Sequence, residues 1–207
     1  MADSRSAFFY GTLMAPQVLH RVCHGSNNPS NPIYAAHQFK TFPAILHDYR
    51  RHRVLNADYP AILPVDAGSA TVRGTFVTGL TDADIWRLDI FEGSEYRRDR
   101  VKIRKLTQTG SDSGEGHQEG EESEAETYVW IGNREDLDER EWDFAEFQRE
   151  KMIFWVGSEG SGEYAEVDDA VATAEQQDGT GGRGANGRIS AALKEEQQRD
   201  EIVKNAV

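Results

Sequence analysis

The sequence predicts a mixed α+β domain followed by a tail. Two observations lead to this fold class: strand-like segments precede and follow a well-capped helix, and a short apolar run near the N-terminus ends in a glycine turn. We expect residues 1–157 to form the domain. Residues 158–207 are rich in glycine and acidic residues, which favours a low-complexity tail.

The chain opens with the pattern of a strand, a turn and a short helix. Residues 7–10 are apolar and end at Gly11, and Pro16 lies where the first helical turn would begin. His24 and Gly25 would end this helix. Its apolar residues recur at helical spacing: Val18, Leu19 and Val22.

Strand-like segments follow. β-branched and aromatic residues gather in residues 44–54, 59–65 and 71–78, with short turns between them. Each of these segments is expected to form one strand.

The next helix has clear boundaries. Thr81 can accept a hydrogen bond from a backbone N–H near Asp84, whose carboxylate can bond back to Thr81. Gly93 is suited to the position after the last turn. A helix is therefore expected from residue 82 to residue 91 or 92.

A hairpin with a disordered loop is expected next. Residues 96–106 alternate in polarity as a strand does, and residues 128–130 would form its partner. Residues 110–126 lie between them and contain seven acidic residues, no Lys or Arg, and many Gly and Ser. Such a composition favours disorder.

The C-terminal part has weaker signals. Residues 141–155 return to helical spacing, and residues 179–187 have the composition of a flexible linker. Residues 188–206 contain helix formers with a thin apolar stripe, which allows a marginal C-terminal helix.

Charge and composition narrow the function classes. The formal net charge of -13 argues against nucleic-acid binding and against an anionic membrane surface. With one cysteine, Cys23, the chain has no intramolecular disulfide. No signal peptide or membrane-spanning run is recognisable, so a cytoplasmic location is expected.

The first candidate site is the turn formed by Tyr10, Gly11, Thr12 and Leu13. A strand that enters a glycine turn and a helix presents several backbone N–H groups in one direction. Such a nest suits a carboxylate. Strand–glycine–helix turns are also common as purely structural features.

Glu92 is the second candidate. It falls at a helix C-terminus, where the dipole disfavours an ionised carboxylate, and burial against Phe91 and Tyr96 would raise its pKa further. A carboxyl group tuned in this way can exchange protons near neutral pH. The alternative is an exposed glutamate paired with Arg97 or Arg98. Tyr96 is either a site residue or a core residue of its strand.

Other chemistry has less support. His37, His47 and His52 lack the spacing of a metal site, so no metal is expected. Cys23, beside His24, is better explained as a small buried apolar residue than as a nucleophile.

These motifs together resemble those of the γ-glutamylcyclotransferase-like superfamily, in the branch of γ-glutamylamine cyclotransferase and the plant avirulence-induced-gene proteins. The resemblance covers about residues 7–155. Its motifs occur in the family's order: Phe8-Phe9-Tyr10-Gly11-Thr12-Leu13, Tyr59-Pro60-Ala61-Ile62, Val72-Arg73-Gly74, Leu88-Asp89-Ile90-Phe91-Glu92-Gly93, Tyr96 and Tyr128-Val129-Trp130.

The resemblance implies a small mixed β-barrel with flanking helices and a cavity at its mouth. It implies that backbone amides of the residue 10–13 turn hold the substrate α-carboxylate and that Glu92 is the acid/base. The reaction would cyclise a γ-glutamyl group to 5-oxoproline and release an amine, without a metal or cofactor.

Two other functions remain open. The chain could be a non-catalytic module that binds a small acid, and an arginine-paired, ionised Glu92 would favour that. It could also be an interaction protein that uses the acidic loop and tail. The leaving amine and the oligomeric state are not specified by the sequence.

Overall fold

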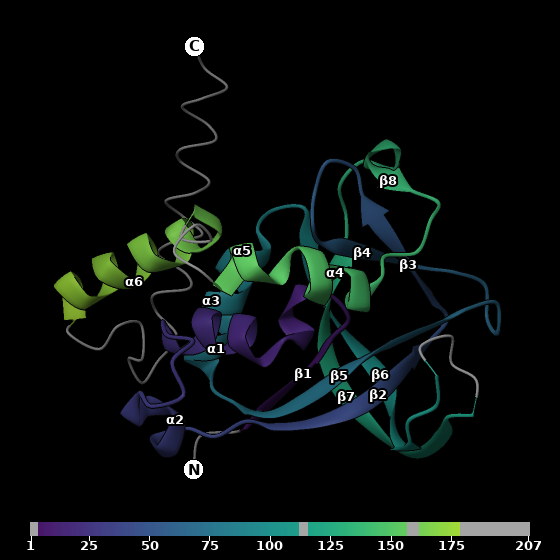
Figure 1. The fold of residues 1–207 in the computed structure, drawn as a ribbon, viewed down its shortest axis with the longest axis horizontal. Helices are drawn as coiled ribbons and strands as arrows, with labels where there is room; N and C mark the ends of the chain where they lie inside the picture. The colour runs from purple at the N-terminus through teal and green to yellow at the C-terminus, as the bar shows by residue number, and fades with distance from the viewer. Residues whose placement is uncertain (1–3, 112–115, 157–161, 179–207) are drawn as a thin grey trace.

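The computed structural model describes residues 4–111, 116–156 and 162–178, and these form a mixed α+β fold (Figure 1). The expected fold class is confirmed. The predicted linker 179–187 and C-terminal helix 188–206 lie outside the described residues. None of the described helices is long and apolar enough to cross a bilayer.

The elements follow one another along the chain as β1 (Arg5–Phe9), η1 (Thr12–Met14), α1 (Pro16–His24), α2 (Pro32–Ala36), β2 (Lys40–His47), β3 (Tyr49–Val54), β4 (Pro60–Pro64), β5 (Thr71–Leu80), α3 (Asp82–Glu92), β6 (Tyr96–Gln108), β7 (Gln118–Trp130), η2 (Arg134–Asp136), β8 (Leu137–Asp138), α4 (Phe144–Glu150), α5 (Met152–Val156) and α6 (Ala165–Asp178).

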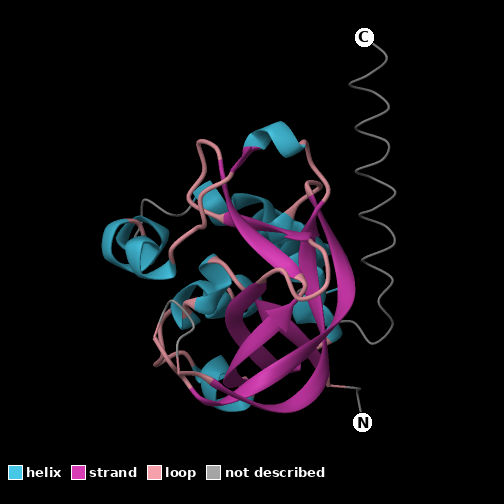
Figure 2. Cartoon of the chain, turned by 90° about the vertical axis from the view of Figure 1, so that its right-hand side faces the viewer, coloured by secondary structure: helices cyan, strands magenta, loops and turns pink. Residues whose placement is uncertain are grey.

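The main sheet closes on itself in the order β1-β5-β2-β6-β7 (Figure 2). Neighbouring strands are antiparallel, except that β1 meets β7 in parallel where Ala7 pairs with Glu126. A second sheet has the order β4-β3-β8.

Strand β1 divides its side chains between two cores. Ala7 and Phe9 belong to a cluster that includes the apolar residues of α1 and α3. Phe8 and Tyr10 point to the opposite face and belong to a cluster with residues of β2, β5, β6 and β7. The period of two along a strand thus joins the helices to the closed sheet through one short segment.

Helices α1 and α3 begin and end at the residues expected from the sequence. α1 ends at His24, with Gly25 at φ 69°. In α3, Thr81 and Asp84 form a reciprocal capping box, and the helix ends at Glu92 before Gly93.

The expected single strand over 44–54 is wrong. The chain breaks at Asp48, whose φ of 65° is left-handed, so that β2 and β3 belong to different sheets. The Asp48 carboxylate accepts a hydrogen bond of 2.7 Å from the Gly68 N–H, which fixes this bend locally.

The expected disordered loop over 110–126 is also wrong where the structure describes it, because β7 begins at Gln118. Its acidic residues lie opposite basic residues of β6. Glu122 pairs with Lys102 at 3.1 Å, and Glu121 with Lys105 at 3.4 Å. The partner strand supplies the counter-charge that the segment itself lacks.

Part of the segment predicted as a low-complexity tail, residues 158–207, forms a helix. Helix α6 packs on the domain, with Tyr164, Val167 and Ala174 buried. Tyr164 lies against Trp155 and Phe91, with ring centroids 6.5 Å and 5.9 Å apart. These few apolar residues anchor an otherwise acidic segment. Residues 141–155 likewise form two short helices, α4 and α5, rather than one.

Gly74 provides a test of the packing between β1 and β5. A Cβ atom at this position would lie 2.3 Å from the Phe9 carbonyl oxygen and 2.5 Å from Phe8 Cζ. We expect Gly74→Ala to lower the free energy of unfolding by about 1–3 kcal/mol, because the backbone must move. Thr71→Ala, at an exposed position of the same strand, should change it by less than about 0.5 kcal/mol. Urea denaturation of both variants measures the difference, and equal stabilities would contradict the predicted clash.

Candidate functional site

A cavity of about 270 Å³ lies where the turn after β1 meets the end of α3. Strand β4, the start of β6 and the segment leading into α6 complete its walls. Its lining residues are Phe8, Phe9, Tyr10, Gly11, Thr12, Leu13, Tyr59, Pro60, Ile90, Phe91, Glu92, Glu95, Tyr96, Tyr128, Trp155, Gly162, Glu163, Glu166 and Val167. The structure therefore brings all the predicted site residues to one cavity.

The turn after β1 presents backbone donors. Met14 N–H donates to the Gly11 carbonyl at 2.9 Å, which forms the first hydrogen bond of the 3-10 turn. The N–H groups of Thr12 and Leu13 precede that bond and have no partner within the turn. Donors of this kind, at the start of a helical turn, suit an anionic group.

Glycine is required at position 11 because Pro60 approaches it closely. A Cβ atom at Gly11 would lie 2.8 Å from both Cγ and Cδ of the Pro60 ring. A proline ring cannot rotate away, so a side chain here would displace the turn or β4.

Arg51 stabilises the turn of residues 10–13, and the sequence did not predict this role. Its Nη1 donates to the Tyr10 carbonyl at 2.9 Å, and its Nη2 pairs with Glu141 at 2.9 Å. Burial lowers the pKa of the Arg51 guanidinium, and the neighbouring Glu141 opposes that shift. No local motif signals the contact, because Arg51 lies 41 residues from Tyr10.

Glu92 forms the opposite wall. It is the last residue of α3 and is half-buried. Burial, reinforced by the negative charge of Asp89, raises the pKa of Glu92 to about 8. The negative end of the helix dipole acts in the same direction. The carboxyl group therefore exchanges its proton close to neutral pH.

The alternative pairing of Glu92 with an arginine is wrong. Arg97 pairs with Asp99 at 2.8 Å, whereas Arg98 pairs with Asp89 at 2.8 Å and also with Glu126. In the described part of the chain, no ion pair engages the Glu92 carboxyl. The carboxylate one helical turn earlier, Asp89, receives the available positive charge instead.

Tyrosines make up much of the remaining wall. Tyr96 donates its hydroxyl to the Pro60 carbonyl at 2.9 Å, Tyr128 to Asp89 at 2.9 Å, and Tyr10 to the Tyr128 carbonyl at 2.6 Å. Burial is the main cause that raises the pKa of each of these phenols. All three remain neutral hydrogen-bond donors at physiological pH.

Three acidic residues that line the cavity were not predicted from the sequence: Glu95, Glu163 and Glu166. The last two lie in the segment predicted as a low-complexity tail. Arg21 fixes that segment to α1 by pairing with Asp168, at 2.5 Å. The only sequence signal for this packing was the apolar pair Tyr164 and Val167.

The other sequence candidates lie elsewhere. Cys23 is buried, and burial raises the pKa of its thiol well above the usual value, which fits an inert core residue. His47 pairs with Glu119 at 2.9 Å, and His52 bonds to the Asp138 carbonyl at 3.0 Å. None of these three side chains lines the cavity.

Fold and site together define a mixed α+β protein with a carboxyl group of raised pKa in the wall of a cavity. Residues 7–149 match the family model described as "Gamma-glutamyl cyclotransferase, AIG2-like". The chain belongs to this family.

Known relatives are similar over the same region. The chain is 28% identical over 146 residues to "Protein AIG2 C" from Arabidopsis thaliana, covering 70% of this chain and 73% of that protein. It is 32% identical over 149 residues to "Protein AIG2 B" from the same plant, covering 72% and 73%. A solution structure of an Arabidopsis thaliana protein has 25% identity and a TM-score of 0.47, and the match covers 90% of this chain and 92% of that chain.

The raised pKa of Glu92 predicts that the free energy of unfolding depends on pH. Folding moves this pKa from 4.5 to about 8, so between these pH values the folded state keeps a proton that the unfolded chain releases. The free energy of unfolding should therefore fall with rising pH in this window, by up to about 1.4 kcal/mol per pH unit from this group. Glu92→Gln removes the effect and should gain stability relative to the wild type from pH 4.5 to 8.

Urea denaturation at several pH values measures this difference. Glu139→Gln serves as a control, because Glu139 is exposed and lies outside the cavity. It should follow the wild type across the whole range. A pH-independent difference between Glu92→Gln and the wild type would mean that the pKa of Glu92 is not raised by folding.

Proposed function

We propose that this protein is a cyclotransferase that converts a γ-glutamyl group to 5-oxoproline and releases an amine. One observation carries the proposal: Glu92, with a pKa of about 8, shares a cavity with the Gly11 turn and its backbone donors. The family to which the chain belongs supports the same reaction class.

The proposed reaction is intramolecular. The α-amino nitrogen of the γ-glutamyl group attacks its own γ-carbonyl carbon and forms the new C–N bond of a five-membered ring. The bond between that carbon and the leaving amine then breaks. The attacking nitrogen loses a proton and the leaving nitrogen gains one, so the step is balanced without an added reactant.

Glu92 is the proposed proton carrier. Its ionised form accepts the proton from the attacking amine, and its protonated form delivers a proton to the leaving amine. A group with a pKa of about 8 can perform both tasks near neutral pH, whereas a glutamate with an ordinary pKa is a poor acid there.

The turn opposite Glu92 is the proposed anchor for the substrate α-carboxylate. The N–H groups of Thr12 and Leu13 would donate to it, and Gly11 leaves the backbone open to close approach. Tyr96, held by its bond to the Pro60 carbonyl, would close the side of the bound glutamyl chain. Holding both ends of a tethered substrate folds it for ring closure, which is the main requirement of such a reaction.

The two other functions have less support in the structure. A module that only binds an acid does not need a carboxyl group with a raised pKa, and Glu92 lacks the arginine partner that would make it a fixed anion. An acidic interaction segment is disfavoured because residues 119–122 pair with basic residues of β6.

Purified protein incubated with a panel of γ-glutamyl amines tests the proposal directly. We expect 5-oxoproline to form from at least one of them, and Glu92→Gln to lower kcat/KM by about 10²–10⁴-fold, because the proton carrier is lost. Glu139→Gln is the matched control and should retain activity. Turnover unaffected by Glu92→Gln would remove this residue from the mechanism.

The pH dependence gives an independent test. Because the free enzyme must present ionised Glu92 to accept a proton, kcat/KM should rise with pH up to an inflection near the pKa of about 8. A profile that is already flat between pH 5 and 7, measured with the same substrate, would contradict the assigned role.

A further inference from the structure

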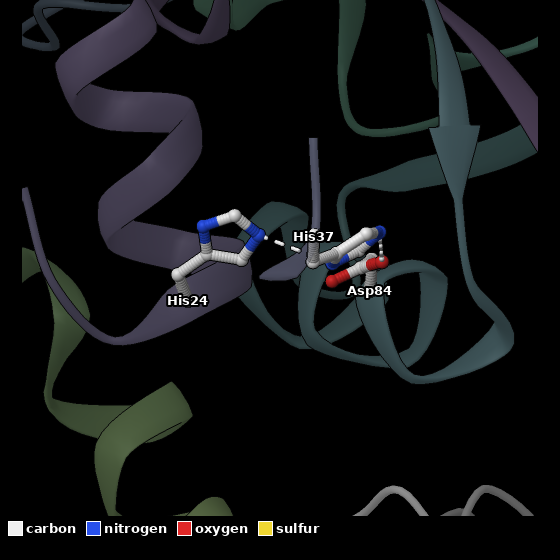
Figure 3. Close-up of side chains that lie close together, drawn as sticks. All are labelled: His24, His37 and Asp84. Atoms are coloured by element: carbon white, nitrogen blue, oxygen red, sulfur yellow. Dashed lines mark hydrogen bonds and ion pairs between the residues drawn. The ribbon is translucent and has the colours of Figure 1, made fainter. Parts of the chain in front are cut away.

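Three potential metal ligands meet on the side of α1 and α3, outside the cavity. His24 is the last residue of α1, His37 follows α2, and Asp84 lies in the first turn of α3. Their side chains point toward one another (Figure 3), and one ligand atom from each lies within 4.8 Å of the others. None of the three lines the cavity around Glu92.

The spacing of the two imidazoles fits a shared ion. His24 Nε2 lies 3.2 Å from His37 Nδ1. Zinc binds imidazole nitrogen at about 2.0–2.1 Å in a tetrahedral arrangement, which places two such ligands about 3.4 Å apart. The two imidazole nitrogens already lie close to that separation, and the Asp84 oxygen, which lies within 4.8 Å of both, must move toward them for one ion to bind all three ligands.

A hydrogen bond to the Gly79 carbonyl orients the His37 ring for metal binding. Its Nε2 lies 2.8 Å from the carbonyl oxygen of Gly79, a contact that requires the proton on Nε2. The lone pair of Nδ1 then faces His24. A ligating histidine commonly donates its second ring N–H to a carbonyl in this way.

Asp84 contributes a buried negative charge. The residue is 2% exposed, and its Oδ2 accepts from the N–H and hydroxyl of Thr81 at 2.7 and 2.6 Å. These bonds fix Oδ2 beside the His37 ring, 3.5 Å from Nε2, and one oxygen of the same carboxylate lies within 4.8 Å of a ligand atom of each histidine. A buried carboxylate next to imidazoles is stabilised by a cation.

An aromatic cover surrounds the cluster. Phe39 stacks on His24 with centroids 4.8 Å apart, and Tyr34 stacks on His20 at 4.1 Å. The Nδ1 atoms of His20 and His24 lie 3.1 Å apart, so a proton on His24 Nδ1 can be donated to His20. That tautomer leaves His24 Nε2 with a lone pair directed at His37.

We propose that His24, His37 and Asp84 bind one divalent transition-metal ion of the zinc type. Two imidazoles and a carboxylate match the ligand preference of Zn²⁺, and a water molecule would complete four-fold coordination. The ion would tie the end of α1, the residue after α2 and the start of α3 together. Its role is structural, because the ligands do not reach the reaction cavity.

The full-length protein, stripped with a chelator, provides the test. Isothermal titration with Zn²⁺ in excess Mg²⁺ should show one saturable site. Loss of an outer-shell partner costs a metal site about 10–100-fold in affinity, so loss of a direct ligand in His24→Gln or His37→Gln should cost about 100-fold or more. His52→Gln is the control, because His52 is a half-buried histidine of the second sheet and should not alter binding.

Cobalt provides a second readout that does not depend on a variant that folds. Co²⁺ bound to the wild type should give the visible absorption of a four-coordinate site, and added Zn²⁺ should abolish it. If the wild type shows no saturable Zn²⁺ site, or if the two histidine variants fold and bind as it does, the cluster is a hydrogen-bonded histidine chain and the proposal is wrong.

Discussion

The desolvation of one carboxyl group, that of Glu92, is the constraint to which the rest of the site is fitted. Glu92 and Asp89 lie one turn apart on α3 but in opposite electrostatic environments. Asp89 receives hydrogen bonds from Arg98 and Tyr128, whereas burial raises the pKa of Glu92 to about 8. The charge on Asp89 adds to that rise. A single helix thus holds an ion-paired carboxylate beside a carboxyl group that titrates near neutral pH.

The contacts that close the sheet also help to create the different electrostatic environments of Asp89 and Glu92. The parallel pairing of Ala7 with Glu126 brings the end of β1 next to β7. Tyr10 then donates to the Tyr128 carbonyl, and the Tyr128 hydroxyl donates to Asp89. Arg98 bridges Asp89 and Glu126 from the other side. Closure of the sheet therefore fixes the position of the donor turn relative to α3.

Features encoded in neighbouring residues could be predicted from the sequence. The capping box of Thr81 and Asp84 lies within one turn and formed as expected. The turn at Gly11 and the end of α3 at Glu92 were also recognisable, since glycine punctuates both. Features that depend on distant partners could not be predicted. The seven acidic residues between 110 and 126 suggest disorder, but in the folded chain Lys102 and Lys105 of β6 pair with Glu122 and Glu121 of this segment.

Other contacts also join residues that are far apart in the sequence, and such contacts could not be predicted from it. Tyr164 lies in a segment with the composition of a tail, yet it is buried against Phe91 and Trp155. His20 and His24 have the spacing of two ligands on one helix face, but His37 and Asp84, rather than His20, complete the cluster with His24. Such sets of residues become evident only once the chain has folded.

Desolvation of the Glu92 carboxyl group has an energetic consequence for the whole fold. A group whose pKa is raised on folding destabilises the folded state at every pH at which the unfolded chain would ionise it. An isosteric neutral residue would avoid that cost, so packing alone does not explain a glutamate here. The cost is explained if the proton on Glu92 is used. The tyrosine wall and the α6 residues that line the cavity then contribute to the environment of that proton as well as to the core.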